Sequence, residues 1–179
     1  MTENVEVTLV RVEDALPVLS ATPAVLRSLL EPLSAEWLEF HEDAQAWSPR
    51  RVLVHFIQNE IANWIPRAKV ALSAGEERKF VPYQPQAEQD DGIDMRELLS
   101  KFAALRKDNL TALRDFHLKE EDYLRTAEHP SLGIVTLGQL LATWVVHDLN
   151  HIHQIVKSLA KRNTAAVGPW KQYLGILEI

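Results

Sequence analysis

The chain contains no cysteine in its 179 residues, and this absence excludes several kinds of chemistry at once. A disulfide framework, a cysteine nucleophile, a thiolate metal site and an iron–sulfur cluster all require the missing thiol group. Any metal ion that the protein binds directly must therefore be held by histidine or carboxylate side chains.

Glycine is also scarce, with six residues, and the sequence has neither a glycine-rich phosphate loop nor a GxSxG nucleophile motif. No apolar run reaches the 18 residues that a membrane span needs, and the N-terminal segment does not resemble a signal peptide. We therefore expect a cytoplasmic protein. The net charge is −6, and Lys and Arg are scattered among acidic residues. This argues against a nucleic-acid partner, because contacts to phosphates need a clustered basic surface.

The composition is typical of one soluble domain, with 46% hydrophobic and 25% charged residues. We expect residues 1–179 to form a single domain whose core covers about residues 13–162. Helical periodicity dominates this range and predicts an all-α four-helix bundle with a short N-terminal arm and a C-terminal tail helix. Val5, Val7 and Leu9 alternate with polar residues, so the arm is either an edge strand or an ordered extension. Residues 168–179 are expected to pack back on the bundle.

Proline and cap signals divide the first half of the chain. Thr22 followed by Pro23 is typical of an N-cap with a first-turn proline, so Pro17 and Pro23 are expected to break the first helical region into two pieces. Ser48 gives the same signal ahead of a long, mainly apolar segment, and Gly75 is a stop signal near its end. This segment is expected to be a central helix.

The second half of the chain contains two further helices. Residues 76–93 carry prolines, a glycine and no hydrophobic period, which predicts a long loop that crosses one end of the bundle. Asp94 is expected to cap an amphipathic helix over 95–118, and Thr136 to cap the last long helix over 137–162.

Two histidines lie one helical turn apart on the apolar face of the last helix. His147 and His151 share this face with Leu140, Trp144 and Ile155. A buried polar group without a partner costs on the order of 1–3 kcal/mol, so two imidazoles on the core side need a common partner. The HxxxH spacing lets both rings bind one metal ion, and the sequence therefore predicts a metal site here.

A third ligand is expected from the central helix, where His55 lies in the apolar segment RRVLVHFIQNEIANW. Three histidines with an open coordination position are typical of catalytic zinc, although nickel and iron(II) also accept imidazole ligands. Other interpretations stay open. His55 alone could be a core histidine bonded to a backbone carbonyl, and an isolated HxxxH pair also occurs by chance on surface helices.

Several neighbours are candidates to support the metal ligands. Asn59 lies one turn beyond the histidine of the central helix, and with Glu60 it could orient a ligand or accept a proton. Trp144 could line the pocket. Asp148 and Asn150 flank the histidine pair at about 100° and 300° around the helix, so they are less expected to reach the ion. No catalytic side chain is assigned.

Two segments, AWSPRRVLVHFIQNE and HPSLGIVTLGQLLATWVVHDLNHIHQI, resemble the DinB-like superfamily, which includes the YfiT-type metal-dependent hydrolases. The resemblance implies a four-helix bundle with a divalent metal, most often zinc or nickel, bound by His55, His147 and His151. It also implies a homodimer.

Characterised members of the family include S-transferases and isomerases that use a low-molecular-weight thiol. The resemblance thus implies an enzyme whose metal ion activates a thiol cofactor or a water molecule for attack on a small electrophilic substrate, with loop 76–93 shaping access. A non-catalytic binding or interaction module stabilised by the metal is the alternative.

Overall fold

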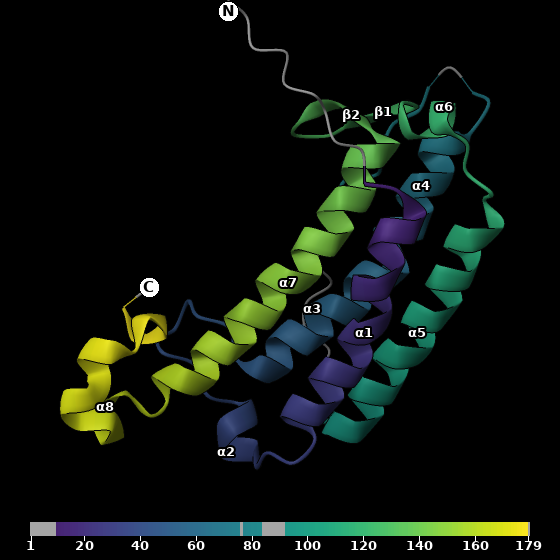
Figure 1. Ribbon diagram of the computed structural model, residues 1–179. Helices are drawn as coiled ribbons and strands as arrows, with labels where there is room; N and C mark the ends of the chain where they lie inside the picture. The colour runs from purple at the N-terminus through teal and green to yellow at the C-terminus, as the bar shows by residue number, and fades with distance from the viewer. Residues whose placement is uncertain (1–9, 76, 84–91, 179) are drawn as a thin grey trace, which may run out of the picture.

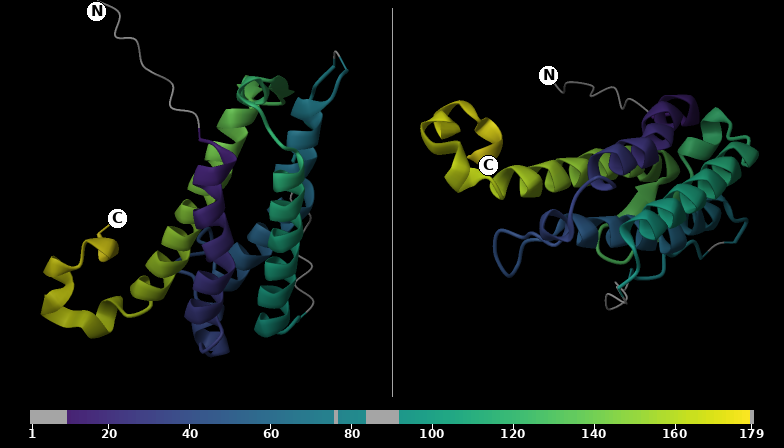
Figure 2. Two further views of the ribbon diagram at one scale, coloured as in Figure 1. Left: turned by 45° about the vertical axis from the view of Figure 1, so that its right-hand side comes forward. Right: turned by 90° about the horizontal axis from the view of Figure 1, so that it is seen from below.

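The computed structural model describes residues 10–75, 77–83 and 92–178, so the alternating pattern of residues 1–9 lies outside the described chain. Its long elements are α1 (Val12–Leu30), α3 (Pro49–Ala62) continued by α4 (Trp64–Leu72), α5 (Met95–Asp115) and α7 (Leu137–Lys161). Helix α1 packs against α5 and α7, and α3 packs against the same two helices. The four form a closed bundle (Figures 1 and 2), as the sequence predicts. Short helices α2 (Ala35–Leu38) and α6 (Glu120–Tyr123) lie in the connections.

Helix α1 is continuous through Pro17 and Pro23, so the expected break into two pieces is wrong. Thr22 does not cap a helix; its side chain is buried within α1. A proline inside a helix removes one hydrogen bond to the carbonyl four residues earlier. For Pro23 that carbonyl belongs to Leu19, and it accepts a hydrogen bond from Arg106 Nη1 at 2.8 Å instead. This replacement offsets part of the cost of keeping proline inside the helix.

The central helix begins where the sequence predicts, because the Ser48 hydroxyl accepts a hydrogen bond from the backbone N–H of Arg51 at 3.2 Å. It does not run unbroken to Gly75. Helix α3 ends at Ala62 and α4 ends at Leu72, with Asn63 between them at φ −108° and ψ −72°. The Asn63 amide donates to Asn59 Oδ1 at 2.8 Å, a contact that holds the junction from within the bundle.

Both cap predictions in the second half are confirmed. Asp94 accepts from the N–H of Arg96 at 2.8 Å and begins α5. Thr136 accepts from the N–H of Gln139 at 3.1 Å, and the Gln139 side chain accepts in return from the N–H of Thr136 at 2.9 Å. This reciprocal pair is a capping box that fixes the start of α7.

A small β-hairpin between α6 and α7 was not predicted. Strands β1 (Thr126–His129) and β2 (Gly133–Thr136) pair antiparallel, and the turn between them needs Gly133 at φ +73°. The described part of loop 76–93 adds to this hairpin, since Lys79 forms a parallel bridge with Glu128. The end of the loop at Ile93 lies at the opposite end of the bundle (Figure 1), where the Ile93 carbonyl accepts from Arg50 Nη1 at 2.8 Å at the start of α3. The loop therefore connects the two ends of the bundle along its length, and the expected crossing of one end is wrong.

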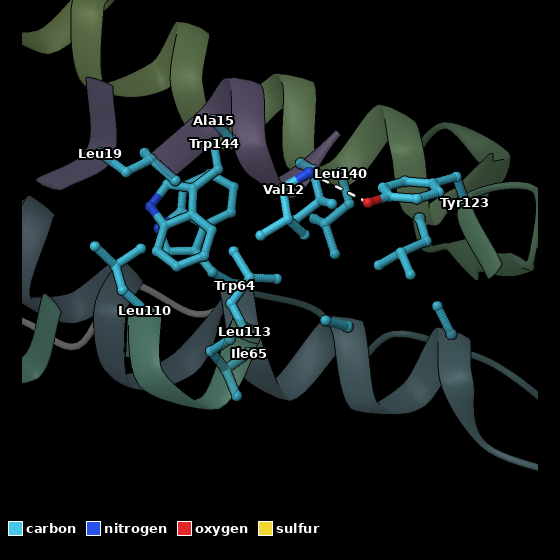
Figure 3. Packing of buried hydrophobic residues seen from close by; sticks show 14 of the residues in the cluster. Val12, Ala15, Leu19, Trp64, Ile65, Leu110, Leu113, Tyr123, Leu140 and Trp144 are labelled. Carbon is cyan, nitrogen blue, oxygen red and sulfur yellow. Dashed lines mark hydrogen bonds between the residues drawn. The ribbon is translucent and has the colours of Figure 1, made fainter. Parts of the chain in front are cut away.

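The interior of the bundle has two apolar clusters. One centres on Trp64 and Trp144, whose rings stack with centroids 5.5 Å apart and planes at 8° (Figure 3). The other contains Phe56 and Phe102, with ring centroids 5.2 Å apart. The metal-site candidates of α3 and α7 lie between aromatic residues of both clusters.

The expected tail helix is a series of short turns: α8 (Thr164–Val167), η1 (Gly168–Tyr173) and η2 (Gly175–Leu177). It packs back through its end, where Leu177 is buried and its carbonyl accepts from Lys161 Nζ at 3.0 Å. The rest stands off the bundle (Figure 2), and Trp170 is 71% exposed. Among the described residues, no helix combines the length and hydropathy that crossing a membrane requires.

Candidate metal centre

The structure brings together the three histidines that the sequence selects. His55 comes from α3, His147 and His151 come from α7, and one ring nitrogen of each lies within 4.8 Å of the others. The Nε2 atoms of His55 and His147 are 3.1 Å apart. Two imidazoles bound tetrahedrally to one zinc ion at ~2.0–2.1 Å place their nitrogens about 3.3 Å apart. The donor set and its spacing therefore fit a single divalent ion.

Burial keeps the rings of His55 and His151 in the neutral form that a metal ion binds. Burial, followed by the nearby His151 and His147, lowers the pKa of His55 to about 4. Burial followed by His147 also lowers the pKa of His151. Only a neutral imidazole offers a lone pair to a metal, so near neutral pH neither ring has a proton to lose before it binds.

Hydrogen bonds orient two of the three histidines. His151 Nδ1 lies 2.8 Å from the Gln154 amide oxygen, which makes Nδ1 the protonated nitrogen and leaves Nε2 free. Asn59 Nδ2 donates to the His55 carbonyl at 2.8 Å and lies 3.0 Å from His55 Nε2, so this amide borders the histidine cluster. Gln154 was not singled out from the sequence, although its i+3 spacing from His151 was a signal.

Two aromatic side chains border the histidines. The Trp47 ring lies parallel to the His151 ring at 6.2 Å and meets the His55 ring edge-on at 5.1 Å. Tyr83, from the described part of loop 76–93, meets the His55 ring edge-on at 6.2 Å and donates its hydroxyl to Gln58 at 3.1 Å. Nothing in the sequence around Tyr83 points to this position. The loop does contribute to the surroundings of the site.

His147 packs against aromatic rings of both apolar clusters. Its ring meets the rings of Trp64 and Phe56 edge-on at 5.0 and 5.8 Å. Trp144 stacks on Trp64 and is 1% exposed, so it belongs to the core behind this contact. His147 Nδ1 is buried with no hydrogen-bond partner within the described chain, and it lies 3.9 Å from Asp148 Oδ1. A metal on Nε2 would place the proton on Nδ1, facing this carboxylate.

Beneath the histidines lies a buried charge network centred on Arg106, which is 1% exposed. Its guanidinium donates to both oxygens of Asp148, at 2.6 and 3.0 Å, and to Glu60 at 2.9 Å. Asn109 also donates to Glu60, at 2.9 Å. The carboxylate of Glu60 is thus committed to this network and not to the histidines. The burial of Arg106 had a signal in the sequence, since Arg106 lies midway between Phe102 and Leu110 at four-residue spacing on the apolar face of α5.

The pKa values of the two acids of this network are shifted in opposite directions. Burial raises the pKa of Glu60 despite the opposing effect of Arg106. Burial would also raise the pKa of Asp148, but contacts with His147, Arg106 and Thr22 outweigh it and hold this pKa below its usual range. Asp148 therefore remains a carboxylate beside the metal centre, where it balances the buried guanidinium.

Comparison with known proteins identifies the family of this chain. The model of the DinB superfamily matches residues 19–155, which include the three histidines and the charge network. The chain belongs to the DinB superfamily. A curated member of similar length from Oceanobacillus iheyensis, named "Putative metal-dependent hydrolase OB0782", is 28% identical over 161 residues, which cover 88% of this chain and 90% of the relative.

A solved structure shares the fold of this DinB-superfamily protein. YfiT from Bacillus subtilis, described as "a probable metal-dependent hydrolase with an unusual four-helix bundle topology", superposes with a TM-score of 0.72 at 21% identity. The match covers 90% of this chain and 93% of YfiT. The fold is thus shared over nearly the whole chain.

Proposed function

We propose that the chain is a metal-dependent enzyme in which His55, His147 and His151 bind one divalent ion, with zinc the first expectation and nickel or iron(II) the others. The convergence of three imidazole nitrogens within 4.8 Å carries this proposal. The hydrogen bond from His151 to Gln154 supports it, because oriented imidazoles of this kind are typical of metal ligands. The Oceanobacillus relative, named for metal-dependent hydrolysis, adds support from the family.

The proposed reaction is the attack of water or a low-molecular-weight thiol on a small electrophilic substrate. When bound, the ion supplies a positive charge that lowers the pKa of such a nucleophile toward neutrality. Asn59 Nδ2, 3.0 Å from His55 Nε2, is placed to donate a hydrogen bond to an oxygen of the substrate as negative charge develops there. Trp47 and Tyr83 border His55 and limit the access of bulk water.

The chain is also expected to act as a homodimer in the cytoplasm, without a nucleic-acid partner. These expectations come from the sequence and from the family resemblance, and they stay predictions. Sedimentation of the metal-loaded protein tests the oligomeric state directly.

The first experiment is the metal content of protein purified without a histidine tag. We expect about one equivalent in the wild type, measured by mass spectrometry. His55→Ala, His147→Ala and His151→Ala are expected to lose it. His153→Ala is the matched control, because His153 is an exposed histidine on the same helix, two residues beyond His151. Unchanged metal content in all three site variants would contradict the proposal.

Activity is then tested on the loaded protein with a panel of esters, amides and electrophiles, each with and without added thiol. Turnover that disappears on chelation and returns with metal supports the enzyme. A metal that only raises the melting temperature, with no turnover, would instead favour a metal-stabilised binding module, because a ligand of the folded state stabilises any fold that binds it.

A further inference from the structure

A small hollow of about 150 Å³ adjoins the metal centre along the C-terminal half of α7. Its wall is formed by α7 and by the segment between α2 and α3. Trp47 and Gln154 line it, together with three charged side chains, Glu42, Lys157 and Lys161. No role assigned above to the metal centre uses these charges.

The hollow shares two of its lining residues with the metal centre. Trp47 lies parallel to the His151 ring, and Gln154 holds His151 Nδ1 by a hydrogen bond. At about 100° per residue, Gln154 and Lys161 fall within about 40° of His147 around α7. Lys157 lies about 80° from His147 by the same measure, so the hollow borders the histidine face of this helix toward its C-terminus.

The cations of the hollow differ in their partners. The Lys161 ammonium lies 3.3 Å from Glu42 and donates to the Leu177 carbonyl at 3.0 Å, so its charge is already balanced. Lys157 has no ion pair or hydrogen bond with any residue in the described ranges, and it is half-buried. With one acid and two bases, the hollow carries a net charge of +1, contributed by Lys157.

A neutral donor lies beside this free cation. Gln154 uses its amide oxygen for His151, and its NH₂ group makes no hydrogen bond to the part of the chain that is described. Gln154 and Lys157 are three residues apart on a helix, so their side chains are neighbours. An ammonium beside an amide N–H suits an anion that accepts two hydrogen bonds.

We propose that this hollow binds the carboxylate of a ligand whose other end lies at the metal centre, with Lys157 and Gln154 as the two donors. A carboxylate matches the single unbalanced positive charge, whereas a phosphate monoester carries about −1.5 to −2 near neutral pH. The inference rests on the proposed function and narrows its substrate class to acids with a reactive group at the far end. Trp47 forms the apolar wall along which the connecting chain runs.

The position of Lys157 sets the length of that chain. It lies six residues beyond His151, which corresponds to about 9 Å along the helix axis and about 120° around it, so the distance to be spanned is at least of this order. A short acid such as mercaptoacetate cannot span this distance, whereas an extended 6-mercaptohexanoate approaches it. The carboxylate should therefore contribute to binding only in the longer members of an ω-mercapto acid series.

Cobalt(II)-loaded protein provides a direct readout, because binding of a thiolate to cobalt gives a charge-transfer absorption band that can be titrated. We expect 6-mercaptohexanoate to bind the wild type about tenfold more tightly than 6-mercaptohexanol, a difference of about 1.4 kcal/mol. Mercaptoacetate and 2-mercaptoethanol should show no such difference. Lys157→Gln should abolish the preference of the long acid and leave the affinity of the alcohol unchanged.

The control is Lys107→Gln, which removes an exposed lysine from α5 and should keep the full preference. Equal binding of the long acid and alcohol by the wild type would overturn the inference, and so would a preference that survives in Lys157→Gln. Absence of the band with every thiol would overturn it too. If the protein binds cobalt, each of these three results contradicts the carboxylate site but not the proposed metal centre. If the protein does not bind cobalt at all, both proposals are refuted.

Discussion

Arg106 occupies the hydrogen-bonding position that Pro23 leaves open in α1. The Leu19 carbonyl, which would accept from the N–H of residue 23 in an unbroken helix, accepts from Arg106 Nη1 at 2.8 Å. A buried guanidinium has five N–H donors, and two carboxylates do not satisfy all of them. The proline that looks like a helix breaker in the sequence thus provides an acceptor that the buried charge network needs.

Arg106→Met should be the most destabilising single change in this network. It leaves Asp148 and Glu60 buried without their cation, and breaking a buried ion pair in this way costs about 3–5 kcal/mol. The free energy of unfolding measured in urea gives the value. Lys107→Met is the matched control on the next, exposed position of α5, and it should change stability by less than about 0.5 kcal/mol.

A second prediction concerns Thr22, whose hydroxyl donates to Asp148 Oδ2 at 2.6 Å. Thr22→Val keeps the shape of the side chain and removes this donor to a buried carboxylate, which should cost about 1.5–3 kcal/mol. Thr111→Val on the exposed side of α5, where the hydroxyl meets only the Lys107 carbonyl, serves as the comparison. Equal losses of unfolding free energy in the two variants would show that the hydrogen bond to Asp148 stabilises the fold no more than an exposed hydrogen bond does.

The sequence was sufficient for the elements that depend on local signals. Ser48, Asp94 and Thr136 cap the helices that their positions predict, because capping involves residues only two or three positions away. Helical spacing also brought His147 and His151 to one face, and an apolar environment singled out His55. Each of these inferences needs only the period of the helix and the polarity of neighbouring residues.

The sequence failed where a distant partner decides the outcome. Pro23 was expected to break α1, but its cost is offset by Arg106, 83 positions further along the chain. Glu60 was expected near the metal, but Arg106 and Asn109 hold its carboxylate in the core. Tyr83 reaches His55 from a loop without hydrophobic period, so no local pattern could have placed it there.

The role proposed for Asn59 can be separated from metal binding. Asn59→Ala should keep about one equivalent of metal, since no ligand is removed. Loss of the amide that would stabilise a developing negative charge should lower kcat about 10²-fold. The comparison uses whichever ester or thiol-acceptor substrate the metal-loaded wild type turns over. A variant with full activity would remove Asn59 from the reaction.

The metal-free protein should lose stability as the pH falls from about 6.5 toward 4. Burial lowers the pKa of His55 to about 4, so over this range the unfolded chain binds a proton that the folded state does not. The stabilising contribution of this neutral ring is present above pH 6.5 and is lost as the pH approaches the folded pKa. The raised pKa of Glu60 acts in the opposite direction, since it favours the folded state as the acid is protonated.

Thermal melting of the chelated protein at several pH values between 7 and 4 measures this dependence. His55→Gln should reduce the slope, because the glutamine does not titrate, while the contributions of Glu60 and of His151, whose pKa is also lowered by burial, are retained. A slope in His55→Gln as steep as that of the wild type would assign the effect to other groups.

The buried network also has a consequence for the motions of the bundle. Asp148 belongs to α7, Glu60 to α3, Arg106 to α5 and Thr22 to α1, so every long helix contributes a polar group to one connected cluster. Detaching any one helix removes a hydrogen-bond or ion-pair partner from a buried charged group on another helix, which makes partial opening costly. Amide hydrogen exchange of these four segments should therefore slow to a common rate near the cluster, with the bundle opening as one cooperative unit. The tail from Thr164 onward has no place in the cluster and should exchange independently.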